Sequence, residues 1–331
     1  MKRRRLKSKK NTRYSFLPIL TGSDLSARRL PMMETRGKEP GPVVWITGCI
    51  HGDEVGGIVV IQEVFKYLAT NPLLKGTVHA LPLMNPIGFE NVTRHLTVTH
   101  EDLNRVFPGR KDGSLAERTA HIIFSTIEKT DPSLVIDLHN DWNNSIPYTL
   151  TDPYPGLARR TAYRETQRLA HATGFAVINE EESPDDRDDL RRSLSGSMLS
   201  HGVPSFTIEL GPAYVVKEEF VALGVKSVLN VLCELGMLPE CERFVYPTPK
   251  QFDDKVLRYT HEPRASKSGV VRFIAKPGAA VKKGDILARI YNPFGRLEET
   301  ILAPRDALIL GHTDYSVAFP GMELYAFGYS S

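Results

Sequence analysis

Hydrophobic residues follow two different periods between residues 43 and 235. Short apolar runs of the kind that form buried strands lie at 43–47, 77–83, 134–138, 175–178 and 205–208. Apolar residues at helical spacing occupy 57–68, 115–129, 156–173, 195–201 and 218–235. Because strands alternate with helices along the chain, we predict an α/β layered structure with a mainly parallel sheet.

Local signals mark the ends of several predicted helices. Ser114 and Glu117 form a capping-box pattern in front of 115–129, in which each side chain can bond the backbone of the other residue. The Asp-Pro pair at 131–132 stops this helix, and glycines that can close other helices stand at 174, 202 and 236. These signals support the helical interpretation independently of the apolar period.

Beyond Pro239 the pattern changes. Prolines at 239, 247 and 249 predict a linker, and no helical period follows it. Short strand-like runs at 270–275, 286–291, 299–302 and 308–310 are separated by turns rich in Pro and Gly. We therefore divide the chain into a basic, flexible tail over 1–20, an α/β domain over 21–250 and a small all-β domain over 251–331.

The composition is that of a soluble globular protein, with 41% hydrophobic and 24% charged residues in a chain of 331. The net charge of +3 comes from the tail, because residues 1–13 hold eight Lys or Arg and no acid. The rest of the chain has 34 basic and 39 acidic residues. Since no basic patch with interleaved aromatic residues follows the tail, we expect neither nucleic-acid nor membrane partners.

The length of the apolar runs and the spacing of the cysteines indicate the cellular compartment. No run approaches the ~20 apolar residues of a membrane-spanning helix, and 16–20 is too short for the core of a signal peptide. Cysteines at 49, 233 and 241 follow neither a disulfide framework nor a CxxC metal pattern. We expect a cytoplasmic protein in which Cys49, at the end of a buried strand, is an inert core thiol.

The segment 48–57, Gly-Cys-Ile-His-Gly-Asp-Glu-Val-Gly-Gly, carries the first candidate chemistry. It lies between a predicted strand and a predicted helix, so that His51 and Glu54 are three residues apart in a turn. At this spacing both side chains can face one point, and imidazole nitrogen with carboxylate oxygen is a ligand pair suited to zinc. Gly52 lets the backbone pass close to that point. In isolation the same pair is also typical of a solvated surface turn.

Residues that follow two other strands can join this pair. His139 comes directly after 134–138, and Glu209 comes directly after 205–208. Ligands of open parallel sheets bind outside the carboxyl ends of the strands, so we expect these side chains near the first pair. Two imidazoles and one carboxylate leave one zinc position open for water, and Glu209 can take a proton from that water.

The segment 102–109, Asp-Leu-Asn-Arg-Val-Phe-Pro-Gly, supplies candidate substrate contacts. The planar guanidinium of Arg105 can pair with a carboxylate through two hydrogen bonds, and Asn104 adds another donor. Arg94 is a second cation, able to face a scissile carbonyl as it becomes an oxyanion. Each of these residues by itself is more typical of a solvated surface.

Five motifs occur in one order, and together they carry a resemblance. They are His-x-x-Glu at 51–54, Asn-Pro at 85–86 with Arg94 nine residues after the Asn, the segment 102–109, Asp-Leu-His at 137–139 and Glu-Leu-Gly at 209–211. This order resembles the succinylglutamate desuccinylase/aspartoacylase family, a branch of the zinc carboxypeptidases, over about residues 43–212. The resemblance implies a zinc-carboxypeptidase-like α/β/α sandwich and hydrolysis of the amide bond of a small N-acyl amino acid.

The same resemblance implies a role for each matching residue. The metal ligands implied are His51, Glu54 and His139, for one zinc ion per chain. The residues implied to act on the substrate are Glu209 as general base and acid, Arg94 as the group that polarises the carbonyl, and Asn104 with Arg105 as the groups that hold the carboxylate. Residues 21–250 would then form a zinc-dependent catalytic domain.

The C-terminal region resembles a barrel-sandwich module of the biotinyl/lipoyl type. The matching stretches are 269–271, 277–287 and 303–304, with Gly, Pro and Asp at the turns. A carrier module needs a Lys at the tip of the hairpin after Ile290, but the tip over 292–296 contains none. We therefore expect a structural domain, serving as a wall of the active-site mouth or as an oligomer contact.

Alternatives remain open from the sequence. A metallocarboxypeptidase would use the same chemistry on peptides, and a non-catalytic binding or scaffold protein would not bind metal. The acidic stretch 180–189 fits a solvated loop, and it also fits a selector for a cationic substrate. The chain also resembles those members of the family that deacetylate acetylated diaminobutyrate. Neither the acyl group and amino acid nor the number of subunits in a homo-oligomer follows from the residues.

Overall fold

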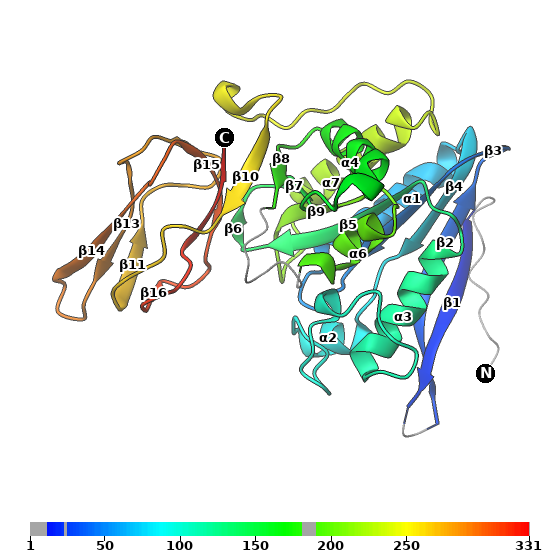
Figure 1. The fold of residues 1–331 in the computed structure, drawn as a ribbon, viewed down its shortest axis with the longest axis horizontal. Helices are drawn as coiled ribbons and strands as arrows, with labels where there is room; N and C mark the ends of the chain where they lie inside the picture. The colour runs from blue at the N-terminus through cyan, green and yellow to red at the C-terminus, as the bar shows by residue number, and fades with distance from the viewer. Residues whose placement is uncertain (1–11, 23–24, 181–189, 331) are drawn as a thin grey trace.

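The computed structural model describes residues 12–22, 25–180 and 190–330. A long mixed sheet of 13 strands runs through the molecule, and a second sheet of four strands packs at its C-terminal end (Figure 1). The order in the long sheet is β1 (Thr12–Thr21), β2 (Ala27–Arg36), β4 (Lys75–Leu81), β3 (Glu39–Gly48), β5 (Leu134–Asp141), β9 (Ser205–Pro212), β7 (Tyr148–Thr151), β8 (Val177–Asn179), β10 (Val256–Thr260), β17 (Tyr325–Tyr329), β15 (Ala307–His312) and β12 (Ala280–Val281), with β6 (Asn144–Ser145) beside β15.

The centre of this sheet is parallel, as predicted. Strand β3 runs parallel to both β4 and β5, and β5 runs parallel to β9. Strands β7 and β10 are likewise parallel to β8, whereas β7 is antiparallel to β9 and the pairings toward both edges are antiparallel. The carboxyl ends of β3, β5 and β9 therefore meet at one edge of the sheet.

Helices cover both faces of the α/β part, which confirms the layered α/β/α fold (Figure 1). One layer consists of α1 (Gly56–Thr70), α4 (Arg160–Ala172) and α7 (Glu218–Glu234). The other contains α2 (Pro86–Asn91), α3 (Leu115–Glu128) and α6 (Leu194–Ser200). Alternation along β3 sends Val44 and Ile46 into the first core and Trp45 into the second. The described residues also form the short 3₁₀ helices η1 (Leu103–Arg105), η2 (Leu157–Arg159) and η3 (Lys250–Phe252).

The start of α3 shows how local sequence directs this fold. The Ser114 hydroxyl accepts the backbone N–H of Glu117 at 3.2 Å, and the Glu117 carboxylate accepts the backbone N–H of Ser114 at 2.9 Å. Both halves of the predicted capping box are therefore present.

The predicted N-terminal tail was wrong over residues 12–20. Residues 12–20 belong to β1 and pair with β2, whereas the sequence predicted a tail over 1–20. Leu17 and Ile19 pack against the core beneath α3, while Tyr14 and Phe16 on the other face are exposed. The high density of charge in residues 1–13 concealed the alternation that makes this strand. Residues 1–11 lie outside the described part.

The C-terminal region is all-β, as predicted. Its four-stranded antiparallel sheet has the order β14 (Leu297–Leu302), β13 (Ile286–Tyr291), β11 (Gly269–Phe273) and β16 (Val317–Ala318). This sheet packs on the end of the long sheet around a core that includes Val271, Ile290 and Phe327. We call residues 256–330 the β unit. Because β10 pairs with β8, the long sheet continues from the α/β part into the β unit.

The cysteine prediction was only half right. Cys233 in α7 forms a disulfide with Cys241, with 6.3 Å between their Cα atoms, although the spacing gave no sign of a disulfide. The chain reverses at Gly236, where φ is 63°, and so returns Cys241 to the side of Cys233. Cys49 is a buried free thiol, and burial raises its pKa to about 12, as expected for an inert core residue.

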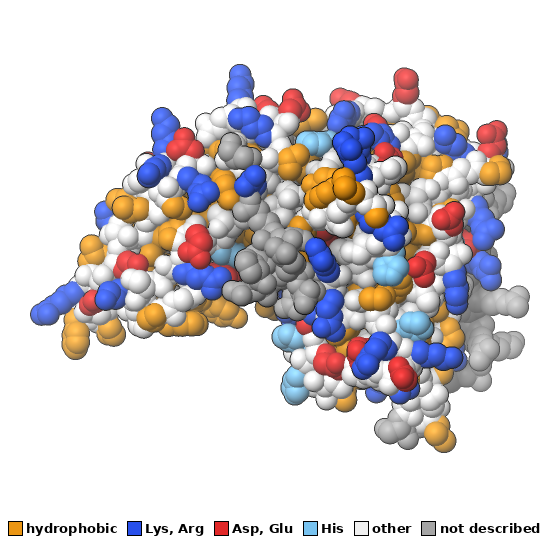
Figure 2. All heavy atoms as spheres, viewed as in Figure 1, with side chains coloured by type: hydrophobic (Ala, Val, Ile, Leu, Met, Phe, Trp, Pro, Cys, Tyr) orange, Lys and Arg blue, Asp and Glu red, His pale blue; other side chains and the backbone are white. Residues whose placement is uncertain are grey.

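The surface is mixed in character. Figure 2 shows Lys and Arg side chains interspersed with Asp and Glu over the visible face of both the α/β part and the β unit. Within the described residues, no helix combines the length and apolar character needed to cross a bilayer.

Candidate metal centre and active site

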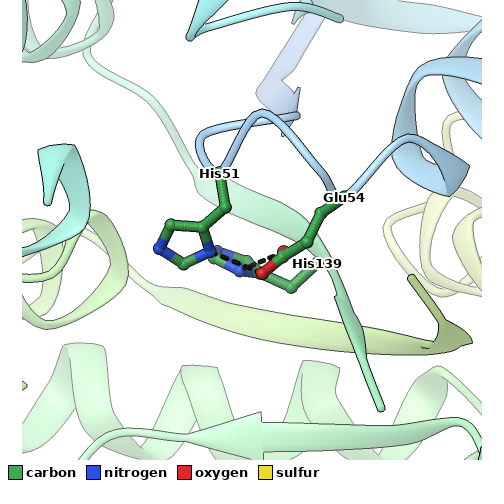
Figure 3. A group of neighbouring side chains, drawn as sticks. All are labelled: His51, Glu54 and His139. Carbon is green, nitrogen blue, oxygen red and sulfur yellow. Dashed lines mark hydrogen bonds and ion pairs between the residues drawn. The ribbon is translucent and has the colours of Figure 1, made fainter. Parts of the chain in front are cut away.

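Three buried side chains converge at the carboxyl edge of the sheet (Figure 3). His51 lies in the turn after β3, Glu54 lies just before α1, and His139 lies near the end of β5. Their potential ligand atoms are all within 4.8 Å of one another. Nδ1 of His51 is 2.6 Å from Oε1 of Glu54, and Nδ1 of His139 is 2.9 Å from Oε2. The sequence prediction that these residues meet is therefore supported by the geometry.

The turn that carries His51 needs glycine at position 52. A Cβ atom there would lie 1.9 Å from the backbone carbon of Gly88, which is impossible without displacing α2. The turn is tied to the neighbouring segment because Asn85 donates its backbone N–H to the carbonyl of Cys49 at 2.9 Å. The predicted close backbone approach at Gly52 is thus present, and it fixes where His51 points.

Two carboxylates that the sequence reasoning missed orient the imidazoles. Nε2 of His51 is 3.2 Å from Asp102, and Nε2 of His139 is 3.0 Å from Asp137. Asp137 also accepts a hydrogen bond from the hydroxyl of Thr47 at 2.7 Å. If each Nε2 carries the proton toward its carboxylate, each Nδ1 presents a lone pair to Glu54 and the centre of the group.

A signal for Asp137 was present in the sequence. Residues two apart on a strand share a face, so Asp137 had to lie on the same face as His139. An aspartate in the otherwise apolar, buried run 134–138 needs a partner, and the imidazole supplies it. Asp102 had no such signal, because its contact with His51 joins segments 51 residues apart.

Electrostatics favours an ionised Glu54, and the carboxylates around His139 attract a positive charge at this point, which a bound cation can supply in place of a proton. Burial opposes ionisation of Glu54, yet the imidazoles of His51 and His139 hold its pKa below the usual range. Burial likewise opposes protonation of His139, but the carboxylates of Asp137 and Glu54 raise its pKa well above the usual value. Two imidazoles and one ionised carboxylate in a buried group form a donor set that fits a divalent cation such as zinc.

Asn140, which the sequence analysis did not single out, braces this group. Its backbone N–H donates to Oε2 of Glu54 at 3.0 Å. Its side-chain oxygen accepts the backbone N–H of Gly56 at 3.0 Å, and its amide nitrogen donates to the carbonyl of Pro212 at 2.8 Å. A single side chain therefore fastens the start of α1 to the end of β9, and Glu54 is held between them.

Glu209 lies on the strand next to His139. The two residues are register partners in the parallel pair of β5 and β9, and Tyr148 on β7 is the partner of Glu209 on its other side. Oε2 of Glu209 is buried and has no hydrogen-bond partner among the described residues. Burial raises the pKa of Glu209 well above its usual range, and the carboxylates of Glu54 and Asp141 add to this shift against the opposing effect of His139.

Arg94 lies at the more exposed side of the metal group. Its Nε donates to Asp102 at 3.0 Å, and its Nη1 is 3.7 Å from Oε1 of Glu54. The side chain is 40% exposed, so a molecule entering from solvent can reach it.

The two remaining predicted residues lie on η1. The side-chain oxygen of Asn104 accepts the backbone N–H of Leu194 at 2.8 Å, which leaves the amide NH₂ as the donor end of this side chain. Arg105 donates from Nη1 to the carbonyl of Asn104 at 2.9 Å. Asn104 therefore also anchors α6, a structural task that the sequence did not reveal.

The β unit contacts the segment that follows His139. The backbone and side-chain N–H groups of Asn143 donate to the carboxylate of Asp314 at 2.8 and 2.9 Å. Gly311 of β15 pairs with Ser145 of β6. Apart from Glu180, the predicted acidic stretch 180–189 lies outside the described residues.

Comparison with known proteins gives a consistent result. Residues 40–235 match the sequence model of the succinylglutamate desuccinylase/aspartoacylase catalytic domain. The N-alpha-acetyl-L-2,4-diaminobutyric acid deacetylase of Halomonas elongata is 25% identical over 285 residues, which cover 84% of this chain and 80% of the relative.

Solved structures show the fold. An aspartoacylase family protein from Mesorhizobium loti superimposes with a TM-score of 0.78 at 22% identity, covering 97% of this chain and 95% of that one. A metallo-carboxypeptidase from Burkholderia cenocepacia has a TM-score of 0.54 at 16% identity, covering 67% and 64% of the two chains. By its matched domain, this chain belongs to the succinylglutamate desuccinylase/aspartoacylase family.

Proposed function

We propose that this chain is a zinc-dependent hydrolase that cleaves the amide bond of a small N-acyl amino acid. The observation that carries the proposal is the buried group of His51, Glu54 and His139 with the uncommitted carboxyl of Glu209 on the adjacent strand. Bound zinc would polarise the amide carbonyl and lower the pKa of a water molecule to about 7.

Glu209 is the proton carrier in this proposal. Its unpartnered Oε2 accepts a proton as the water oxygen bonds to the acyl carbon, and it returns that proton to the nitrogen as the C–N bond breaks. Atoms and protons then balance, since one water adds across one amide. The burial that raises the pKa of Glu209 helps the side chain to hold the proton between the two steps.

Cationic and amide groups bind the substrate on the side of α2 and η1. Arg94, beside Glu54 and open to solvent, donates to the carbonyl oxygen as this oxygen gains negative charge. The guanidinium of Arg105 and the amide NH₂ of Asn104 hold the carboxylate of the amino acid. This arrangement requires a substrate with a free carboxylate next to the scissile amide.

The contact between the β unit and the α/β part favours a small substrate. Asn143, only four residues after the proposed ligand His139, donates to Asp314, and this contact supports our proposal that the β unit forms a wall beside the catalytic group. A peptide extending past this wall would have to displace the contact. A relative acts, by its name, on an acetylated diamino acid, and we extend that substrate class to this chain.

The test combines metal analysis with a substrate screen. Purified protein is stripped with a chelator, reloaded with zinc, and assayed with N-acetyl, N-succinyl and N-formyl amino acids and with unblocked tripeptides. We expect about one zinc per chain and release of free amino acid from an N-acyl substrate only. His51→Ala is the matched variant that should lose both metal and activity.

Other outcomes identify the rival functions. Tripeptide hydrolysis without deacylation would indicate a carboxypeptidase. A chain that takes up no zinc after reconstitution would be a binding or scaffold protein, and the proposal would be wrong.

A further inference from the structure

Three exposed apolar residues follow the strand that carries the proposed base. Tyr214, Val215 and Val216 come one residue after the end of β9, and their exposed fractions are 49%, 50% and 41%. Single exposed apolar residues are ordinary on a protein surface, whereas a run of three is unfavourable unless it has a function. We call residues 214–216 the apolar strip. A strip of this kind is typical of a binding surface.

The backbone at Tyr214 is strained. Its φ is 62°, a left-handed conformation that residues other than glycine rarely adopt. The turn is only three residues long, because Val215 donates its backbone N–H to the carbonyl of Ala213 at 2.7 Å. Glycine would adopt this φ without a steric cost, so a tyrosine at this position indicates a role for the side chain.

This turn lies beside the metal group. Tyr214 donates its backbone N–H to the carbonyl of Asp53 at 2.9 Å, and Asp53 immediately precedes the proposed ligand Glu54. Partial burial raises the pKa of the Tyr214 phenol above its usual value, and the carboxylate of Asp53 raises it further. Smaller contributions come from Tyr315 and Asp314 of the β unit. The ring therefore lies between the turn of the metal group and the β unit.

The apolar strip and the proposed carboxylate site lie on opposite sides of the metal group. Tyr214 is tied to the turn that leads into α1, which packs on one face of the sheet. Asn104 and Arg105 belong to η1, whose Leu103 packs in the core on the other face. An amide joins the amino acid through its nitrogen and the acyl group through its carbon, so the acyl group extends away from the bound carboxylate. On this placement the acyl group leaves the metal group toward Tyr214.

We propose that the apolar strip binds the acyl group of the substrate, so that N-acyl amino acids with longer apolar acyl groups are hydrolysed faster than their N-acetyl counterparts. This inference rests on the proposed function and extends it to the acyl side of the substrate. The ring of Tyr214 contacts the first carbons of the acyl chain, and Val215 with Val216 contacts the later ones. Three residues span at most about 10 Å, which accommodates an acyl chain of about six carbons.

The test varies the acyl group at a constant amino acid. N-acetyl, N-butanoyl and N-hexanoyl derivatives of L-alanine, L-aspartate and L-2,4-diaminobutyrate are assayed on the zinc-loaded parent, and the amino acid that is released fastest is used for the comparison. A methylene that leaves water completely raises affinity about 4-fold, and partial burial on this open strip should give about 2-fold. We therefore expect kcat/KM to rise by about 10-fold from the acetyl to the hexanoyl substrate.

Two variants and a matched control test the role of the ring. Tyr214→Gly suits the positive φ and should fold, and it should lower kcat/KM by about 10-fold for the hexanoyl substrate but by less than about 3-fold for the acetyl one. Tyr214→Phe keeps the ring and should retain the preference of the parent. Tyr67→Ala removes a tyrosine that is 38% exposed near the far end of α1, and it should change neither value.

Calorimetry gives a readout that does not require turnover. The zinc-loaded Glu209→Gln variant should bind the N-hexanoyl compound about 10-fold more tightly than the N-acetyl compound. Adding Tyr214→Gly to this variant should remove most of the difference, because the chain loses the surface that it covers.

Each contrary outcome has one meaning. If Tyr214→Gly hydrolyses the hexanoyl substrate faster than the parent, the ring blocks the acyl group, and if it loses equal activity on all acyl groups, the ring only supports the fold; both results overturn the inference while the deacylase function stands. A parent without a preference for longer acyl groups would overturn it as well. If no N-acyl compound is hydrolysed, the proposed function fails, and calorimetry on the parent still decides whether the strip binds the chain. If Tyr214→Gly does not fold, Val215→Ser and the preference of the parent carry the test.

Discussion

The α/β part and the β unit bury different kinds of side chain. The His, Asp and Glu side chains buried in the α/β part are those of His51, Glu54, His79, Asp137, His139 and Asp152. In the described residues of the β unit no His, Asp or Glu side chain is buried, and its otherwise apolar core contains only the hydroxyl groups of Thr313, Tyr325 and Tyr329. Burying an ionisable group lowers the stability of the folded state unless hydrogen bonds or opposite charges compensate for the loss of water. The α/β part therefore holds its candidate site residues at a cost in stability. The β unit contacts the segment that follows His139 through its surface residue Asp314.

The largest effect we predict concerns the proposed base in the α/β part. Glu209→Gln keeps the shape of the side chain but cannot accept a proton, so kcat should fall by about 10²-fold to 10⁴-fold. Zinc content, measured by elemental analysis, should stay at the parent value because Glu209 is not a proposed ligand. Glu219→Gln, on the exposed first turn of α7, is the matched control and should retain parent activity. Parent-like turnover by Glu209→Gln would remove Glu209 from the mechanism.

The β unit should respond to the opposite kind of change. Phe327→Ala removes a ring that is 1% exposed in its apolar core, and we expect the free energy of unfolding to fall by about 3–5 kcal/mol. The same change at Phe294, which is 89% exposed at the tip of a hairpin, should have little effect. Urea unfolding of both variants measures the difference. Equal effects of the two variants would show that this core does not stabilise the unit.

The buried Asp152 should make the stability of the α/β part depend on pH. Burial raises the pKa of Asp152 to about 7, and its Oδ2 has no hydrogen-bond partner among the described residues. In the unfolded chain its pKa is about 3.9, so between about pH 4 and 7 the folded state holds a proton that the unfolded state releases. Stability should therefore decrease as pH rises through this window, by up to about 4 kcal/mol, and stay low above it.

The neutral variant Asp152→Asn tests this sign. It should raise the free energy of unfolding at pH 8 and leave it nearly unchanged at pH 4, as measured by urea unfolding at both values. Lower stability of the variant at pH 8 would show that the charged carboxylate contributes to the fold.

The smallest effect we predict concerns the orientation of a proposed ligand. Asp137→Asn weakens the hold on Nε2 of His139, and we expect zinc affinity to fall by about 10-fold to 100-fold in a chelator competition assay. Thr47→Val, which removes only the hydroxyl bonded to Asp137, should cause a smaller loss in the same assay. If Asp137→Asn binds zinc like the parent, the contact with His139 does not tune the site.

The sequence predicted the residues of the metal group better than it predicted the residues that orient them. His51, Glu54 and His139 were found because each follows a buried strand, and parallel strands end at one edge of a sheet. Asp102 escaped notice because its contact with His51 crosses 51 residues and leaves no local pattern. The strand β7, which brings Tyr148 next to Glu209, was missed because it is only four residues long.

Local patterns decided much of this protein without reference to the fold. Apolar periods and capping residues determined the helices and central strands, and the spacing within 51–54 brought a histidine and a glutamate into one turn, because these are interactions among near neighbours in the chain. Tertiary structure alone decided which carboxylate orients each imidazole, that Asn104 anchors α6, and that the phenol of Tyr148 donates to Asp141. Such contacts depend on strand register and on the packing of distant segments, and no local period encodes them.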